Sequence, residues 1–213
     1  MLRPTRTLLA AASLSLAWIA GALATDGPIP ADAPQAEPVA IDLSVLRDRP
    51  LRHLGTRVRT VIQLSSYDEP WQAQIGRFGP SHFARISAWS DTQFPWVTAD
   101  YLSPAPFLFT RRDSTADFVL RNARAHERFA VTLDVCEQFG GEPWCEIVEL
   151  ERIEPSINEG CVLHASRAIE SRDKGAVELA YSELERALAS PMPAPAHGAL
   201  EALRAKWQAA DGR

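Results

Sequence analysis

Residues 128–152 are the part of the sequence that most limits the possible folds. Apolar and polar side chains alternate along Phe129–Cys136, and a second alternating run from Trp144 to Leu150 follows Gly140-Gly141. Alternation with a period of two is typical of a β-strand with one buried face. Two consecutive glycines tolerate the positive φ values of a type I′ turn. The segment therefore predicts a β-hairpin.

The region before this hairpin carries further strand signals. Short apolar runs are separated by Gly and Pro, and many of the residues are aromatic or β-branched. Ser114 is placed to cap a short helix over Ala116–Asn122, because its hydroxyl can accept from the free N–H groups of the first turn. The expected strands are Gly55–Leu64, Trp71–Phe78, His82–Trp89 and Pro106–Thr110.

Met1–Ala24 has the layout of a secretory signal peptide. Arg3 and Arg6 precede an uncharged apolar run over residues 8–24, which ends in the small-x-small pattern Ala22-Leu23-Ala24. We predict cleavage after Ala24 and export to the periplasm or out of the cell. An uncleaved N-terminal membrane anchor is the alternative, because this run lies at the short end of what spans a bilayer.

The charge balance argues against a dedicated nucleic-acid-binding protein. Removal of the leader takes away two arginines and no acid, so the net charge changes from −5 to −7. Between Asp42 and Glu154 there are 13 arginines and 16 acidic residues, whereas a nucleic-acid binder shows a basic excess. A local basic patch is one interpretation of six of these arginines, and ordinary surface ion pairs are the favoured one. The six are Arg57, Arg59, Arg77, Arg85, Arg111 and Arg112.

The hairpin brings two of the three cysteines together. Counting outward from a two-residue turn places Cys136 opposite Cys145 at a non-hydrogen-bonded pair, where α-carbons lie about 4.5 Å apart. Export supplies an oxidising compartment, so we predict a Cys136–Cys145 disulfide. A redox-active pair is disfavoured, because there is no Cys-x-x-Cys spacing and the nearby glutamates oppose a thiolate. Cys161 is expected to be a small buried helix residue.

Composition divides the chain after the leader into three parts. Thr25–Val39 holds four prolines among small and acidic residues, so we expect an extended linker, which we continue to residue 50. Aromatic residues and short apolar runs mark residues 51–155 as a β domain. Ala, Leu, Glu and Arg recur at helical spacing over residues 156–210 and predict a helical tail.

The order of the expected elements in Leu51–Glu154 resembles the OB-fold, a five-stranded Greek-key barrel with a helix between its third and fourth strands. The resemblance is carried by the strand Gly55–Val61, the helix after Ser114 and the closing hairpin Arg128–Arg152. The implied fold class is α+β, with a small OB-like antiparallel barrel and a C-terminal helical hairpin in a three-helix tail. OB-folds often bind oligonucleotides or oligosaccharides on the open face of the barrel.

Gly160–Gln208 is similar to a tetratricopeptide-type helical hairpin. His164, in the expected first helix Cys161–Ser171, stands where that repeat has a large aromatic residue, and a further helix is expected at Pro195–Gln208. A single repeat is more suited to bracing the barrel than to forming a peptide groove. The residues that approximate the second half of the repeat are Gly175, Ala180, Leu184, Ala187 and Pro191.

The sequence contains no phosphate-binding loop, no nucleophile elbow and no histidine spacing typical of a metal site, so we expect no cofactor. His126 is interpreted as a partly exposed loop residue. Glu137 and Glu146 fall near the turn on the hairpin face that carries Val131 and Leu150. They mark either a barrel mouth or, as we favour, the solvated end of a strand. The other candidate carboxylates for acid–base chemistry are Asp91, Asp100 and Asp113.

The sequence predicts an exported, non-catalytic binding or scaffold protein of the cell envelope. A barrel face and the helical tail would contact a protein or a cell-envelope glycan. The first alternative is a hydrolase with a pair of carboxylates, which requires two acidic side chains across a cleft. The second is a single-stranded nucleic-acid-binding OB-fold, which requires a basic groove with stacking aromatics.

Overall fold

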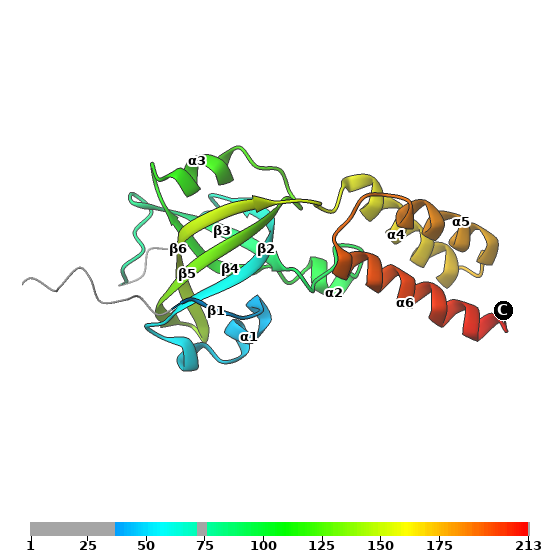
Figure 1. Ribbon diagram of the computed structural model, residues 1–213, viewed down its shortest axis with the longest axis horizontal. Coiled ribbons are helices and arrows are strands. Elements are labelled where there is room, and N and C mark those ends of the chain that lie inside the picture. Colours follow the sequence, from blue (N-terminus) through cyan, green and yellow to red (C-terminus); the bar gives the residue numbers. More distant parts are fainter. Residues whose placement is uncertain (1–36, 72–75, 213) are drawn as a thin grey trace, which may run out of the picture. The chain divides into compact units, whose positions relative to one another are not determined.

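The computed structural model describes residues 37–71 and 76–212, and the predicted signal peptide lies outside these residues. The sheet has the order β1-β2-β3-β4-β6-β5, and a further pairing of β2 with β5 closes the last five strands into a barrel (Figure 1). The elements are β1 Val39–Ala40, α1 Leu43–Asp48, the 3₁₀ helix η1 Pro50–His53, β2 Arg57–Tyr67, β3 Phe83–Ser90, α2 Thr98–Tyr101, β4 Ala105–Arg111, α3 Thr115–Arg121, β5 Arg128–Phe139, β6 Glu142–Ile153, α4 Glu159–Asp173, α5 Val177–Leu188 and α6 Ala194–Asp211.

The connectivity of the barrel confirms an α+β fold with an OB-like barrel. β4 pairs with β6 in parallel, whereas β2–β3, β3–β4, β2–β5 and β5–β6 are antiparallel. Helix α3 connects the third barrel strand, β4, to the fourth, β5. Ser114 caps this helix as predicted, accepting from the backbone N–H of Asp117 at 3.1 Å.

The barrel interior is filled by alternate side chains of its strands. Val58 and Ile62 of β2 and Leu133 of β5 are almost fully buried. Burying such a side chain stabilises a fold by about 1.5–3 kcal/mol. Leu43 and Leu46 of α1 belong to the same core, and Asp42 caps α1 by accepting from Ser44 N–H at 2.8 Å. Residues 42–50, which were expected to belong to the linker, are therefore part of the folded region.

The predicted hairpin forms, with two interruptions of its register. Gly140 and Gly141 have φ values of 61° and 88°, and the pairs counted from the turn are confirmed as far as Glu137 opposite Trp144. The register then shifts between Val135 and Glu137, and shifts again on β6 opposite Thr132–Leu133. An extra residue in one strand of a pair reverses which face the following side chains occupy.

The first register shift corrects the cysteine prediction. Val135, not Cys136, is the partner of Cys145, and all three cysteines are free thiols. Cys136 is the extra residue of the bulge, and its thiol donates to the carbonyl of Asp134 at 3.3 Å. The predicted Cys136–Cys145 disulfide is therefore absent from the structure, because the cysteines do not face each other across the hairpin. Cys161 is buried in α4 as expected.

The strand expected at Trp71–Phe78 is not formed by its described residues. Trp71 and residues 76–78 lie in the β2–β3 connection instead, and Phe78 is nevertheless 1% exposed. The described residues that favoured a strand therefore lie in a loop, from which Phe78 packs against the barrel. The other expected strands are confirmed as β2, β3 and β4.

The tail consists of the hairpin α4–α5 followed by α6. Gly175 has a φ of 77° in the turn between α4 and α5, and the small residues Ala168 and Ala180 are fully buried in the shared core. Trp96, from the β3–β4 connection, belongs to that core as well. Among the described residues, no helix has the length and apolar character required to cross a membrane.

Candidate functional site

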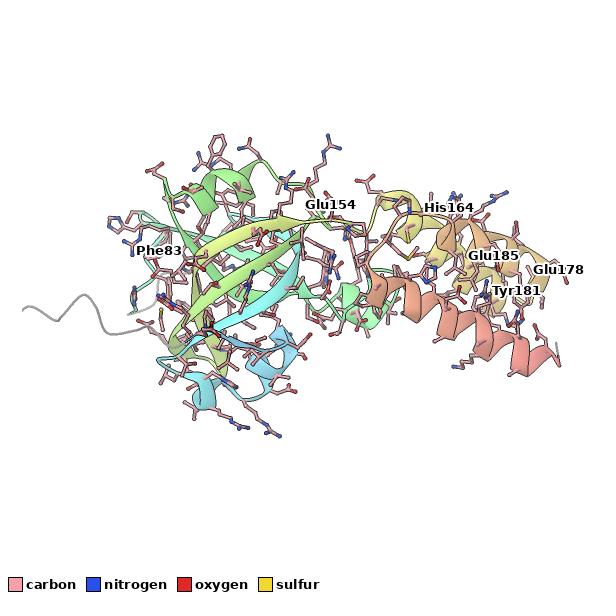
Figure 2. The ribbon with its side chains drawn as sticks, viewed as in Figure 1. Phe83, Glu154, His164, Glu178, Tyr181 and Glu185 are labelled. Carbon is pink, nitrogen blue, oxygen red and sulfur yellow. The ribbon has the colours of Figure 1, made fainter. Side chains whose placement is uncertain are left out.

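An aromatic layer lies outside the barrel core, on strands β3, β4 and β6. Phe78, Phe83 and Phe109 form a separate buried cluster that also contacts Trp71 and Trp144; Figure 2 labels Phe83 on the barrel. The rings of Phe78 and Phe109 are stacked, with centroids 4.3 Å apart. The Phe109 centroid lies 4.9 Å from that of Trp144. These ring contacts hold the aromatic side chains of the layer in fixed orientations outside the barrel core.

A pocket of about 450 Å³ opens beside this layer. Its walls come from the connection after β2, from β3 and β4, and from the β5–β6 turn. These are the strands and loops that OB-folds use for ligands. We call it the aromatic pocket, and it is lined by Pro70, Trp71, Arg85, Pro106, Phe107, Phe109, Phe139, Gly140, Glu142 and Trp144.

Three buried polar atoms of the aromatic pocket have no hydrogen-bond partner among the described residues. They are the indole N–H of Trp71, Nε of Arg85 and Oε2 of Glu142. A buried polar atom without a partner costs about 1–3 kcal/mol, so such atoms are rare and point to a functional role or a bound molecule. The aromatic pocket thus offers two donors and one acceptor that are not used within the described chain.

The charges of the aromatic pocket are neutralised by neighbouring side chains. Arg85 donates to Glu69 at 2.9 Å, and Glu142 accepts from Arg47 at 3.0 Å. Burial alone would raise the pKa of Glu69, but hydrogen bonds from Ser66, Ser87 and Arg85 outweigh it and hold that pKa below its ordinary value. Glu69 therefore stays ionised, and the pocket presents no uncompensated charge.

A second group of polar side chains lies nearby on the same outer surface. Arg77 donates to one oxygen of Glu146 at 2.8 Å, and Arg111 donates to the other at 3.1 Å. Arg77 N–H also donates to Glu137 at 2.9 Å. A Cβ at Gly76 would lie 2.9 Å from the Glu137 carboxylate, so glycine permits this approach. We call Arg77, Arg111, Glu137 and Glu146 the carboxylate cluster.

Glu146 corrects the expectation of a solvated strand end. Its side chain is 8% exposed, and the bulge on β6 turns it away from the barrel interior, which Cys145 and Ile147 occupy instead. A carboxylate this deeply buried requires charged hydrogen-bond donors. The carboxylate cluster therefore has a structural explanation that needs no ligand.

All six arginines considered for a basic patch are ion-paired. Each of these pairs connects two different segments of the barrel and its loops, and Arg112 with Asp68 is among the closest at 2.7 Å. Paired guanidinium groups have little remaining capacity for phosphates. This confirms the favoured interpretation as surface ion pairs: Arg57–Asp134, Arg59–Glu151, Arg77–Glu146, Arg85–Glu69, Arg111–Glu146 and Arg112–Asp68.

Apart from Glu137 and Glu146, which both accept from Arg77, the structure does not bring the candidate carboxylates together. Asp91 binds Arg128 with both oxygens at 2.8 Å, and Asp100 accepts from Phe94 N–H at 3.0 Å. Asp113 adopts a positive φ of 63° in the turn before α3. Glu137 belongs to the carboxylate cluster. None of these side chains lines the aromatic pocket.

His126 is more buried than a loop histidine was expected to be. It is 9% exposed, and its ring stacks on Trp89 at a centroid distance of 5.1 Å. Elsewhere, His164 on α4 (Figure 2) lies 2.7 Å from the buried carboxylate of Glu183. Within the described ranges, no group of three or more His, Cys, Asp or Glu side chains is arranged to hold a metal ion.

Sequence reasoning missed the functional candidates at the turn. The residue pattern gives no separate signal for Phe139 and Glu142, although they flank the loop that lies beside the ligand face in an OB-fold. The available signal is positional, because in an OB-fold the loop between the last two strands lies beside the connection after the first strand, at the ligand face.

Comparisons with known protein families, with curated proteins and with solved structures find no match to this chain.

Proposed function

We propose that this chain is an exported, non-catalytic binding protein of the cell envelope and that the aromatic pocket holds a neutral glycan. The observation that carries this proposal is a pocket of about 450 Å³ with aromatic walls and three buried polar atoms that have no partner among the described residues. Concave, mostly apolar sites with a few polar groups are typical of ligand sites. Export rests on the predicted signal peptide.

The chemistry of a sugar ring matches the walls of the pocket. Its C–H faces can pack on the ring faces of Trp144 and Phe139, which carry partial negative charge. Each hydroxyl both donates and accepts hydrogen bonds. Hydroxyls can therefore partner the donors of Trp71 and Arg85 and the acceptor of Glu142, after small side-chain movements that open these buried atoms.

The charge balance supports a neutral glycan over a nucleic acid. A phosphate backbone is bound mainly by uncommitted Lys and Arg side chains. Arg85, the only arginine among the described residues that line the aromatic pocket, is paired with Glu69. No specific observation favours the carboxylate hydrolase, because Glu142 is the only acidic side chain that the described part of the chain places in the pocket wall.

The helical tail is proposed to brace the barrel, in line with its tetratricopeptide-like sequence. Trp96 of the β3–β4 connection is buried among α4, α5 and α6 residues. Arg128 also reaches past the end of β6, donating to the carbonyl of Pro155 at 2.9 Å. These contacts support a shared core more than a free peptide groove.

Calorimetric titration of the mature chain with chitotetraose, a neutral tetrasaccharide, tests the proposal. We expect saturable binding that Phe139→Ala weakens at least about tenfold, since a stacking aromatic contributes about 1–3 kcal/mol. Phe118→Ala is the matched control, because Phe118 is exposed on α3 and does not line the pocket. Titrations with a tetragalacturonate and a thymidine tetranucleotide, which are both anionic, test whether the pocket prefers a neutral or a charged ligand.

Two results would reject the neutral-glycan assignment. One is binding of the tetranucleotide or the galacturonate in preference to chitotetraose. The other is chitotetraose binding that Phe139→Ala and Phe118→Ala reduce equally. Absence of binding to chitotetraose and to a panel of other neutral oligosaccharides would leave a protein partner as the better assignment.

A further inference from the structure

A second pocket, of about 430 Å³, lies where the β3–β4 and α3–β5 connections meet helix α4. Tyr101 and His126 form one side, and Val162 and Leu163 of α4 form the other, with Glu159 from the first turn of α4. It shares no residue with the aromatic pocket. We call it the junction pocket.

Three stacked rings make one wall of the junction pocket rigid. Trp89 lies between His126 and Tyr101, with centroid distances of 5.1 Å and 5.7 Å. The indole N–H of Trp89 donates to the carbonyl of Tyr101 at 3.3 Å. A wall that is fixed before binding reduces the ordering cost that a ligand must overcome.

His126 supplies a buried polar atom that nothing described in the chain satisfies. The residue is 9% exposed, and its Nδ1 has no hydrogen-bond partner within the described residues. Burial lowers the pKa of His126, and the opposing effect of Glu159 is the smaller one. The imidazole is therefore neutral at pH 7, and in the tautomer protonated at Nε2 its Nδ1 is an acceptor.

The surface around the junction pocket is apolar. Tyr101 and Leu163, which line the pocket, are 50% and 47% exposed. Val97 and Leu102, close to Tyr101 in sequence, are also exposed. Exposed apolar side chains gathered at a concave site are typical of an interaction surface rather than of a solvated one.

The charged group of this pocket is a carboxylate without a counterion. Glu159 forms no ion pair in the part of the chain that the structure describes, and it is exposed in the first turn of α4. The other polar groups of the lining are the Nδ1 acceptor of His126 and the hydroxyls of Tyr101 and Ser166, which can accept as well as donate, so the junction pocket combines apolar walls with several acceptors and one negative charge. An ammonium group, which has three donors and no acceptor, complements this set.

We propose that the junction pocket binds an apolar organic cation, with an aromatic or aliphatic body against Tyr101 and Leu163 and an ammonium group toward Glu159 and His126. This chemistry occurs in free amines and in basic apolar segments of a partner polypeptide. The proposal is independent of the glycan assignment, because the two pockets share no residue.

A pair of probes that differ in charge tests this proposal on the mature chain. Tryptamine carries an ammonium group on an indole, and indole-3-propionate carries a carboxylate on the same ring system. In ¹H–¹⁵N correlation spectra we expect tryptamine to shift the amides of residues 101, 126, 159 and 163 with saturation in the millimolar range. Indole-3-propionate should bind at least about fivefold more weakly, as expected for loss of one ion pair of about 1 kcal/mol.

Glu159→Gln should remove the preference for tryptamine and leave the binding of indole-3-propionate no weaker than before. Glu154→Gln is the matched control, because Glu154 is a nearby exposed glutamate (Figure 2) that does not line the pocket. Equal affinity for the two indoles, or a tryptamine preference that survives Glu159→Gln, would overturn the proposal. Amide shifts on addition of tryptamine that are confined to residues of the aromatic pocket would also overturn the proposal.

The peptide N-acetyl-Trp-Lys-amide distinguishes the two sources of the ligand. Tighter binding of the peptide than of tryptamine supports a polypeptide partner, and the reverse order supports a free amine. Leu163→Ser should weaken both probes if either source is correct. Unchanged affinity of both probes in a folded Leu163→Ser variant would contradict the assigned site.

Discussion

The aromatic pocket and the carboxylate cluster occupy the same outer surface of the barrel but satisfy their polar groups in different ways. In the carboxylate cluster, both oxygens of buried Glu146 accept from arginines. In the aromatic pocket, Trp71, Arg85 and Glu142 each keep one buried polar atom without a described partner. A buried charge is therefore not enough to identify a ligand site, whereas buried polar atoms without partners beside a cavity indicate one.

The difference between the two regions depends on the bulged register that turns Glu146 outward and Cys145 inward. Thiol labelling tests that register and has the largest expected effect. Burial raises the pKa of all three thiols, that of Cys161 to about 11. Cys136 is only half-buried, so we expect the native chain to label there at least about 100-fold faster than at Cys145 or Cys161.

The labelling is measured by mass spectrometry after alkylation and digestion. The unfolded, unreduced chain should give three alkylated thiols. Two missing thiols would instead support the disulfide expected from the sequence, and earlier labelling of Cys145 than of Cys136 would contradict the register.

Removal of the Glu146 carboxylate should destabilise the fold more than removal of the Glu142 carboxylate. Glu146→Gln is expected to cost about 2 kcal/mol in the free energy of unfolding, because two charge-assisted hydrogen bonds to a buried group are lost. Glu142→Gln should cost less than about 1 kcal/mol, since its pair with Arg47 is partly exposed.

Urea unfolding measures both values, with Glu151→Gln as a control on the same strand, where the carboxylate is 71% exposed. Equal losses for Glu146→Gln and Glu151→Gln would mean that the carboxylate cluster is not the structural element described above.

Trp71→Phe removes the unpartnered indole N–H and keeps an aromatic ring. We expect chitotetraose affinity to fall about fivefold, because one hydrogen bond of about 1 kcal/mol is lost. Stability should not fall, since the substitution removes a buried donor that has no partner among the described residues. Titration calorimetry and urea unfolding separate the two effects, and a stability loss without an affinity loss would assign Trp71 to packing alone.

The smallest expected effect is on the pH dependence of stability, and it involves His126 of the junction pocket. Because burial lowers the pKa of His126 from 6.5, the unfolded chain binds more protons than the folded one below about pH 6.5. Stability from this residue is therefore present above that pH and is lost as the pH falls through it. His126→Asn, which tolerates the positive φ of 68°, should reduce the slope of unfolding free energy between about pH 5 and 6.5. An unchanged slope would contradict the assignment of this pH dependence to His126.

The sequence was sufficient for the barrel topology and insufficient for the faces of its strands. The alternation around Gly140-Gly141 predicted the hairpin and the first three pairs correctly. The bulges at Cys136 and opposite Thr132–Leu133 leave no residue-type signal, because each depends on how the whole barrel closes. One added residue moved Cys145 and Ile147 into the core and Glu146 out of it.

The aromatic pocket could be predicted only as a region. An OB-like order of elements implies a ligand face beside the β5–β6 turn and the β2–β3 connection, but the aromatic composition does not separate the rings of the barrel core from those of the outer layer. Phe107 and Phe109 lie two residues apart on β4 and both line the aromatic pocket, yet Phe107 packs with the barrel core and Phe109 with the outer layer. That distinction arises from tertiary contacts, such as the stacking of Phe78 on Phe109.

The most direct test of the central claim is a ¹H–¹⁵N titration of the mature chain with chitotetraose. Binding in the aromatic pocket predicts saturable shifts at the amides of residues 71, 85, 139 and 142, with little change at Glu146 or in the tail. Shifts that centre on Arg77 and Arg111, or on the helices, would contradict it.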